Sequence, residues 1–452
     1  MSTQIFKAYD VRGLCPQEFN EETAYKIGRA TARFLKAKKI AVGQDIRNTS
    51  PALFEKLSQG IREEGADVYN LGLVTTPMVY FASGKLDVEG GIMITASHNP
   101  AQYNGMKFCR REAIPIGTDS GLQEIEKIVR ENNFSSPSSE SIGRIIDYDI
   151  KKEYFDYFTD FLEIGDQKFN LSIDPANAMG ILELEIYRRS LDNFKIHTLY
   201  AEFDGNFPHH EANPLKTETL KDLQQEVIKN NSDLGIAYDG DADRVGFVDE
   251  KGVIIPMDAI TALIAKIILA KHPDSKILYD LRSSMAVKEI IEENGGQAIE
   301  CRVGHAFIKK QMRDEGAVFA GELSGHYYFQ ENYNAEAGSL PVIYLLNLMH
   351  QNKAAVSQLV SDYRRYYHTG EINNEVRDKD AILKKLENRY SQGKISHLDG
   401  VKISFWDQPH GQRWWFNVRP SNTEPVLRLN LEADNQKLMT EKKEEILKII
   451  QN

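Results

Sequence analysis

The segment Gly91-Ile92-Met93-Ile94-Thr95-Ala96-Ser97-His98-Asn99-Pro100 leads from an apolar strand into a turn that displays one hydroxyl group. Residues 91–94 favour a strand, and Asn99-Pro100 ends it because proline restricts the backbone of the residue before it. A strand that ends in a rigid loop with a serine suits covalent chemistry at the Ser97 oxygen. For this segment alone, the simpler interpretation is a turn in which the serine and asparagine side chains only satisfy backbone groups.

Strand-like and helical runs alternate around this segment and along most of the chain. Strands are expected at residues 40–43, 68–73, 91–95, 171–173, 195–200, 234–238, 277–280, 298–303 and 318–321, with helices at 51–64, 217–229, 285–293 and 306–314. This alternation predicts an α/β fold with parallel sheets and covering helices. From residue 371 onward a helix, a strand meander with three tryptophans and a closing helix at 435–450 predict an α+β unit. The polar stretch 135–141 is the expected linker.

The segment Asp239-Gly240-Asp241-Ala242-Asp243-Arg244 alternates three carboxylates within one short loop. Carboxylates this close repel one another unless a divalent cation neutralises them. The main alternative is a calcium loop of the helix-loop-helix type, with Glu250 as its last ligand. Arg244 opposes that alternative because the calcium loop needs glycine there, and the flanks 234–238 and 245–248 resemble strands. A solvated acidic turn is the other alternative.

A third polar segment, Arg419-Pro420-Ser421-Asn422-Thr423-Glu424-Pro425, joins two β-rich runs at residues 414–418 and 426–431. A guanidinium group offers a bidentate fork, and short hydroxyl, amide and backbone donors can surround a tetrahedral phosphate. The segment is therefore a candidate phosphate cradle. A polar hairpin connection is the competing interpretation.

In this order, these segments resemble the α-D-phosphohexomutase family, in particular its phosphomannomutase/phosphoglucomutase branch. The resemblance runs nearly end to end and includes Tyr9-Asp10-Val11-Arg12-Gly13, Tyr103-Asn104-Gly105-Met106-Lys107, residues 174–180, Val303-Gly304-His305 and Gly321-Glu322-Leu323-Ser324-Gly325-His326. Two positions depart from the family pattern: Ala178, where glycine is frequent, and Arg282, where lysine is usual. The second departure matters for proton donation, because arginine stays charged.

The resemblance implies three similar α/β domains with mixed sheets and a C-terminal α+β domain around a central cleft. The expected boundaries are 1–148 for a phosphoserine domain, 149–250 for a domain with the metal-binding loop, 251–366 for a domain with the sugar-binding loop and 367–452 for a phosphate-binding domain. Each domain is expected to direct one loop into the cleft.

The resemblance also implies an isomerase that interconverts the 1-phosphate and 6-phosphate of a hexose, mannose or glucose or both. Ser97 would carry the transferred phosphoryl group, and a hexose 1,6-bisphosphate would serve as intermediate and activator, with one Mg²⁺ per active site. The implied catalytic residues are Ser97, Arg12, Lys107, Arg244, His305 and His326. Metal binding is implied for Ser97, Asp239, Asp241 and Asp243, and substrate binding for Arg282, Glu322, Ser324, Arg419, Ser421, Asn422 and Thr423.

The sequence leaves the general acid and base open. Lys107, His305 and His326 have suitable chemistry. His98 follows the serine directly, but side chains of neighbouring residues in a turn usually point apart, so a structural role is expected for it.

Three other functions remain open. A phosphoglucosamine mutase would share the mechanism, although that branch typically has glutamine where Leu323 stands. A phosphatase that uses Ser97 would differ only in passing its phosphoryl group to water, whereas an acyl hydrolase is disfavoured because no Gly-x-Ser-x-Gly elbow surrounds Ser97. A calcium-binding module would carry no phosphate on Ser97.

Composition narrows the choice of partners. A chain of 452 residues is too long for one core, so three or four domains are expected. The formal net charge of -11 argues against nucleic acid or anionic membrane as partners, and the three scattered cysteines predict neither disulfides nor a zinc site. The start has no apolar signal core, and the apolar run 260–270 is short and interrupted by Lys266. These features agree with a cytoplasmic enzyme, and the resemblance implies a monomer or homodimer that binds small sugar phosphates.

Overall fold

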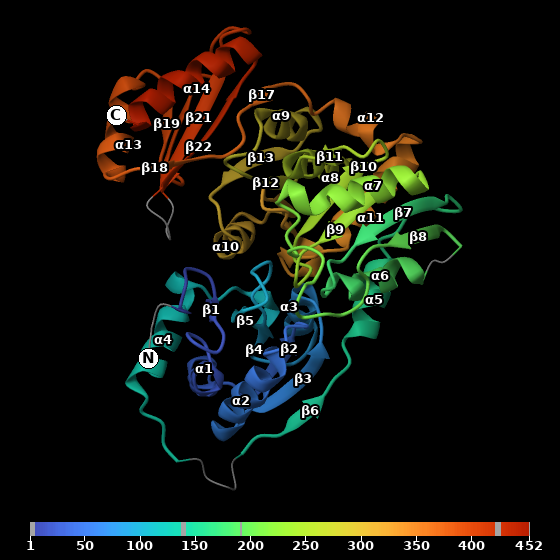
Figure 1. Cartoon of the computed structure of the whole chain (residues 1–452), viewed down its shortest axis with the longest axis vertical. Helices are drawn as coiled ribbons and strands as arrows, with labels where there is room; N and C mark the ends of the chain where they lie inside the picture. The colour runs from blue at the N-terminus through green and yellow to red at the C-terminus, as the bar shows by residue number, and fades with distance from the viewer. Residues whose placement is uncertain (1–4, 137–141, 190–191, 421–425, 452) are drawn as a thin grey trace.

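The computed structural model describes residues 5–136, 142–189, 192–420 and 426–451 and folds them into four domains, each with one β-sheet (Figure 1). The first three sheets mix parallel and antiparallel strands and are covered by helices. The fourth sheet is antiparallel throughout. The predicted fold class, three α/β domains with mixed sheets and a C-terminal α+β domain, is confirmed.

The first sheet has the strand order β1-β5-β4-β2-β3-β6. β2 pairs in parallel with β3 and β4, and β5 is antiparallel to β1 and β4. Two covering helices touch at Gly28 and Gly60, where a Cβ would lie 2.2 Å and 2.1 Å from a carbonyl oxygen of the facing helix. The bounds are β1 Val11–Leu14, α1 Glu21–Leu35, β2 Lys39–Gln44, α2 Ser50–Glu63, β3 Asp67–Leu73, α3 Thr76–Lys85, β4 Gly90–Ile94, β5 Tyr103–Arg110, α4 Leu122–Glu131 and β6 Ile145–Asp147.

The second and third sheets repeat this plan with the orders β11-β10-β9-β7-β8 and β13-β12-β14-β15-β16. The second domain contains α5 Lys151–Thr159, β7 Phe169–Asp174, α6 Gly180–Arg188, β8 Phe194–Thr198, α7 Lys221–Asn230, β9 Leu234–Tyr238, β10 Val245–Asp249 and β11 Ile254–Ile255. The third contains α8 Met257–Lys271, β12 Lys276–Asp280, α9 Met285–Glu293, β13 Gln297–Cys301, α10 His305–Glu315, β14 Phe319–Gly321, β15 Tyr327–Phe329, β16 Ala335–Glu336, α11 Leu340–Asn352 and α12 Val356–Ser361.

In each of these three sheets, one loop joins a parallel strand to the antiparallel strand beside it. These loops follow β4, β9 and β14 and lead into β5, β10 and β15. They contain Ser97, the three aspartates at 239, 241 and 243, and Glu322, respectively. All three lie at the carboxyl ends of parallel strands, where open α/β sheets bind their ligands.

The fourth domain, red in Figure 1, is an antiparallel sheet with two helices. Its strand path is β17-β22-β21-β20-β19, and β18 also pairs with β22. The bounds are β17 Tyr367–His368, β18 Ile372–Glu375, α13 Lys379–Arg389, β19 Lys394–Ser396, β20 Val401–Ser404, β21 Trp414–Pro420, β22 Val426–Ala433 and α14 Gln436–Gln451. Trp414, Phe416 and Leu431 pack with residues of both helices into a separate core.

Most expected elements lie within two residues of the observed bounds, and the expected strand 298–303 ends at Cys301. Two further differences have a visible physical cause. The expected strand 195–200 ends at Thr198, because Tyr200 has a φ of +47° and leaves the extended conformation. The expected helix 217–229 starts as a 3₁₀ turn, where the Thr219 hydroxyl donates to the carbonyl of Asn213 at 2.8 Å, and becomes α7 at Lys221. The expected linker 135–141 lies outside the described residues from 137 onward.

One hydrophobic core continues through the first three domains. The ring of Phe81 in the first domain packs against the ring of Tyr154 in the second, with 5.6 Å between the ring centroids. Leu346 of the third domain belongs to the same cluster. The apolar run at 260–270 is part of α8, most of which is buried in this core. Across the described ranges, no helix is both long and apolar enough to span a membrane.

Glu183 on α6 lies where the first three domains meet. Its buried carboxylate accepts hydrogen bonds from the hydroxyls of Thr75 in the first domain, at 3.0 Å, and of Ser339 in the third. The Tyr154 hydroxyl adds a third bond at 3.3 Å. Burial raises the pKa of Glu183 to about 7, and the three hydroxyls oppose this effect only in part.

We expect Glu183→Gln to make the stability of the protein less sensitive to pH. The folded pKa of about 7 exceeds the ordinary value of 4.5, so the folded state binds an extra proton between these two values. The contribution of this proton to the free energy of unfolding is at most about 3 kcal/mol. It is fully present below pH 4.5 and is lost as the pH rises through about 7. Glutamine does not ionise and removes this dependence.

Urea unfolding at about pH 5 and about pH 8 measures the effect. The free energy of unfolding of the wild type, minus that of Glu183→Gln, should fall between these pH values. Glu185→Gln is the matched control, because Glu185 lies on the same helix with its side chain 45% exposed. The same difference at both pH values would contradict the prediction.

Candidate active site

Ser97 stands in the loop after β4 and is held at both its backbone and its side chain. Its φ is +51°, in the left-handed region, and its N–H donates to Thr95 Oγ1 at 2.8 Å. Its Oγ donates to Asp239 Oδ2 at 2.8 Å, across the boundary between the first two domains. A strained, buried serine facing a carboxylate is typical of a functional position.

The metal-loop candidate lies directly against the serine loop. A Cβ on Gly240 would lie 2.2 Å from the carbonyl oxygen of Ser97, so only glycine permits this approach. β9 and β10 flank the loop, and Glu250 accepts a hydrogen bond from the Ser357 N–H at 3.2 Å. The helix-loop-helix calcium alternative is therefore wrong, because the flanks are strands and Glu250 is directed elsewhere.

The carboxylates of Asp239, Asp241 and Asp243 are all buried, and one oxygen of each lies within 4.8 Å of the others. Among the described residues, Asp241 Oδ1 has no hydrogen-bond partner, and Asp243 Oδ1 has only His326 Nε2, at 3.3 Å. Burial and the two neighbouring carboxylates raise the pKa of Asp239 to about 8. Three buried carboxylates that repel one another fit a hard divalent cation, which Ser97 Oγ would approach from the facing loop.

Lys107 on β5 supplies positive charge to the same cluster. Its Nζ donates to Asp241 Oδ2 at 2.6 Å and also contacts Asp243 Oδ2. Burial alone would lower the pKa of Lys107, but the aspartates outweigh it and raise the pKa above its ordinary value. Lys107 is therefore an ammonium group that offsets negative charge and holds its proton tightly.

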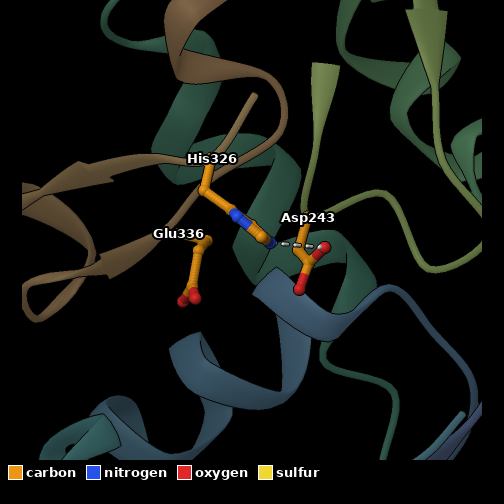
Figure 2. A group of neighbouring side chains, drawn as sticks. All are labelled: Asp243, His326 and Glu336. Atoms are coloured by element: carbon orange, nitrogen blue, oxygen red, sulfur yellow. Dashed lines mark ion pairs between the residues drawn. The ribbon is translucent and has the colours of Figure 1, made fainter. Parts of the chain in front are cut away.

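His326 lies between two carboxylates, so it is held as a cation. Figure 2 shows its ring directed toward Asp243, and its Nε2 lies 3.3 Å from Asp243 Oδ1. Its Nδ1 lies 2.6 Å from Ser324 Oγ and 3.3 Å from Glu322 Oε2. Burial lowers the pKa of His326, but Asp243 more than compensates and the pKa rises to about 9.

Glu336, also drawn in Figure 2, completes a second group that could hold a metal ion with Asp243 and His326. Its two oxygens, however, accept hydrogen bonds from Lys309 Nζ at 3.1 and 2.9 Å. His305 Nδ1 lies 3.6 Å from the same carboxylate. An ammonium group already balances the charge of Glu336, so the three aspartates are the better cation site.

His305 and His98, the two other histidines of the candidate site, are neutral. Burial and then Lys309 lower the pKa of His305 well below its ordinary value. For His98, Arg244 is the largest cause of a similar decrease in pKa, followed by burial. The expectation that His98 points away from the serine is wrong: its Nδ1 lies 3.2 Å from Ser97 Oγ, because the left-handed turn at Ser97 directs both side chains to one side.

One cleft of about 980 Å³ brings together all six residues expected to be catalytic: Arg12, Ser97, Lys107, Arg244, His305 and His326. Arg12 donates to Asp10 Oδ2 at 2.5 Å and to Asn99 Oδ1 at 2.6 Å. Arg244 Nε lies 3.8 Å from Asp239 Oδ2. Cations from the first and second domains thus surround the serine, as transfer of an anionic group requires.

Two of the expected substrate-binding residues, Arg282 of the third domain and Arg419 of the fourth, meet at Glu371. Its carboxylate accepts from Arg419 Nη2 at 3.0 Å and lies 3.5 Å from Arg282 Nη1. Arg282 is held by Asp280 and is 3.8 Å from Glu322 Oε1, so the pair Glu322 and Ser324 adjoins it. Ser421, Asn422 and Thr423 lie outside the described residues.

Sequence reasoning missed Glu371, Glu336 and Arg47. Arg47 is buried and hydrogen-bonds the main chain of the serine loop. The sequence signal for all three is weak, because single charged residues are common on surfaces and their partners are distant in the chain.

Four family models match the chain in sequence order. Models described as phosphoglucomutase/phosphomannomutase alpha/beta/alpha domains I, II and III match residues 3–136, 152–252 and 256–366, and the C-terminal domain model matches 371–449. A phosphomannomutase of Methanocaldococcus jannaschii is 42% identical over 452 residues, covering 99% of this chain and 97% of that protein. One from Escherichia coli strain K12 is 36% identical, covering 95% and 94%.

Solved structures agree with this match. An X-ray structure of a phosphoglucomutase/phosphomannomutase family protein from Burkholderia thailandensis superposes with a TM-score of 0.90 at 28% identity, covering 99% of this chain and 97% of that one. A putative phosphomannomutase from Thermus thermophilus gives a TM-score of 0.82 at 22% identity and covers 100% of both chains. The second likeness supports the fold alone.

Proposed function

Because the chain belongs to the phosphoglucomutase/phosphomannomutase family and is therefore a hexose phosphate mutase of the isomerase class, we propose that it acts on both mannose and glucose phosphates through a phosphorylated Ser97. The observation that carries this proposal is Ser97 Oγ, 2.8 Å from Asp239 Oδ2, in a cleft with five further expected catalytic residues. A serine beside buried carboxylates and cations suits phosphoryl transfer, which needs positioning and charge neutralisation.

In the proposed cycle, phosphorylated Ser97 transfers its phosphoryl group to one hydroxyl of a hexose monophosphate, which gives a hexose 1,6-bisphosphate. The bisphosphate turns over, and Ser97 takes back a phosphoryl group from the other end. Arg12, Lys107 and Arg244 offset the charge of the transferring group. Asp239, Asp241, Asp243 and Ser97 would hold one Mg²⁺, which adds further charge neutralisation when bound.

His326 is our candidate proton donor, since two carboxylates hold it as a cation beside the cleft. The buried Nδ1 of His305 has no hydrogen-bond partner in the part of the chain that the structure describes, so His305 is our candidate acceptor. Glu322 and Ser324 are proposed to bind sugar hydroxyls, and Arg282 to orient Glu322. Arg419, with Ser421, Asn422 and Thr423, is proposed to hold the phosphate that does not react.

We expect Arg419→Ala to raise KM for both the 1-phosphate and the 6-phosphate by about 30-fold, the equivalent of about 2 kcal/mol. The lost contact is present in both the ground state and the transition state, so kcat should change less. Steady-state kinetics in both directions measures this. Arg389→Ala is the matched control, because Arg389 lies in the same domain, is 66% exposed and pairs with Glu445 at 3.3 Å on the closing helix. Unchanged KM values would remove Arg419 from the site.

Substrate choice is tested by kcat/KM for mannose, glucose and glucosamine 1-phosphates measured side by side. We expect the mannose and glucose values to lie within about tenfold of each other, because Glu322 would contact hydroxyls that the two sugars share. A preference for glucosamine 1-phosphate of more than about tenfold would favour the phosphoglucosamine branch. Release of free phosphate in place of the 6-phosphate would indicate a phosphatase.

We further propose that the protein is a cytoplasmic monomer or homodimer without a nucleic acid or membrane partner, and that hexose 1,6-bisphosphate is its activator. The proposed domain boundaries are 1–148, 149–250, 251–366 and 367–452. The family models match 3–136, 152–252, 256–366 and 371–449, so the proposed junctions 148/149 and 366/367 fall between two models. The junction 250/251 falls two residues inside the second match, and β11 at Ile254–Ile255 pairs with the second sheet. Mass measurement in solution tests the oligomeric state.

A further inference from the structure

Arg47 follows β2, is 1% exposed and directs both terminal nitrogens of its guanidinium group at the serine loop and the start of β5. Nη2 donates to the carbonyl oxygens of Ser97 at 2.8 Å and Asn99 at 2.6 Å. Nη1 donates to those of Pro100 at 2.8 Å and Tyr103 at 3.0 Å. One side chain therefore binds four main-chain carbonyls in and directly after the loop that carries the nucleophile.

Arg47 is itself held in place from two sides. Its Nε donates to the buried carboxylate of Asp45 at 3.1 Å, and Asp45 also accepts from Ser50 Oγ at 2.7 Å. On the other side, the guanidinium carbon lies 5.1 Å from the centroid of the Phe207 ring, which belongs to the second domain. These contacts fix the plane of the guanidinium group.

The segment around Phe207 closely approaches the chain around Arg47. A Cβ on Gly205 would lie 2.5 Å from the carbonyl oxygen of Ile46. Asn48 Nδ2 donates to Asn206 Oδ1 at 2.9 Å. The second domain, which also contains the metal-loop candidate, thus contacts Arg47 directly.

We propose that Arg47 is a positioning residue for phosphoryl transfer, which holds the Ser97 loop in its reactive conformation while Phe207 of the second domain holds the guanidinium group. The inference rests on the proposed function of Ser97. A left-handed serine persists only where its surroundings impose that conformation, and the carbonyl of Ser97 itself is one of the four that Arg47 binds. Asn99 is another of the four residues whose carbonyl Arg47 binds, and its side chain accepts a hydrogen bond from Arg12. Arg47 therefore also positions a cation of the cleft.

We expect Arg47→Lys to lower kcat by about 100-fold, because lysine has no planar fork and a shift of about 1 Å at the nucleophile has this effect. KM for the hexose 1-phosphate should stay within about threefold, because no substrate-binding residue is altered. Arg29→Lys is the matched control: Arg29 is a buried arginine of the same domain that pairs with Glu64 at 2.6 Å and lies 4.7 Å from the ring of Phe134.

The decisive measurement is the single-turnover rate at which phosphorylated enzyme passes its phosphoryl group to substrate, corrected for the folded fraction. A slow transfer in Arg47→Lys and a normal one in Arg29→Lys would support a positioning role. Equal rates in both variants, or a change in KM alone, would overturn it.

Phe207→Leu tests the same inference without changing the arginine, and it serves if Arg47→Lys does not fold. It removes the ring face from the guanidinium group, so we expect transfer to slow by about three- to tenfold at unchanged KM. Normal transfer in this variant would overturn the part assigned to Phe207. Failure of the proposed function would be seen in a different measurement. If the wild-type enzyme carried no phosphate on Ser97 during turnover, the phosphoserine mechanism itself would be wrong, whatever the effect of Arg47→Lys.

Discussion

Replacing Ser97 with alanine is expected to abolish mutase activity, by roughly 10⁴-fold or more, because no neighbouring group can accept and return the phosphoryl group. His98 Nδ1 is 3.2 Å from Ser97 Oγ, so it lies beside the serine and does not occupy the place of its oxygen. The fold should persist, since the Ser97 side chain bonds only Asp239 and His98 among the described residues. Mutase assays on both directions of the reaction measure the effect.

The control for this variant is Ser58→Ala. Ser58 is a buried serine of the same domain, on α2, and its hydroxyl has no hydrogen-bond partner within the described ranges, so its removal should leave activity and stability nearly unchanged. Intact mass and peptide mapping would show whether the wild type carries one phosphoryl group and whether Ser97→Ala carries none. Substantial activity in a phosphate-free Ser97→Ala preparation would reject the mechanism.

The sequence revealed those parts of the site in which the chemistry is local. Three aspartates within five residues and a serine directly after an apolar strand stand out in the chain itself. The alternation of strands and helices then placed both segments at the ends of parallel strands. The prediction that these segments belong to one site followed from the resemblance to a family and not from spacing.

The remaining features depend on residues far apart in the chain. Arg47 and Ser97 are separated by 50 positions, and Glu183 and Ser339 by 156. No local pattern reports such a contact, because it forms only when whole domains pack. Glu371 is similar: it joins Arg282 of the third domain to Arg419 of the fourth, and its own neighbours in sequence give no sign of this role.

We expect Asp241→Asn to weaken Mg²⁺ binding and to lower kcat by roughly 10²- to 10³-fold, because one of three carboxylates is lost beside a developing phosphoryl charge. The Asp241 carboxylate also accepts from Thr76 Oγ1 at 2.5 Å and from Lys107 Nζ at 2.6 Å. An asparagine of the same size keeps the bond to Thr76 through its oxygen, so the loop should stay in place. Mg²⁺ titration of the activity after treatment with a chelator measures the change.

Glu250→Gln is the informative control for the metal loop. In a calcium loop of the helix-loop-helix type Glu250 would be the last ligand, whereas here its carboxylate accepts hydrogen bonds from Ser357, at 2.5 Å from the hydroxyl and 3.2 Å from the N–H. We therefore expect Glu250→Gln to keep the Mg²⁺ dependence of the wild type. If the chelator and Asp241→Asn both left the rate intact, the three aspartates would have to be a structural charge cluster neutralised by Lys107, Arg244 and His326. If Glu250→Gln instead shifted the Mg²⁺ dependence as far as Asp241→Asn does, the ligand set would extend beyond the loop that faces Ser97.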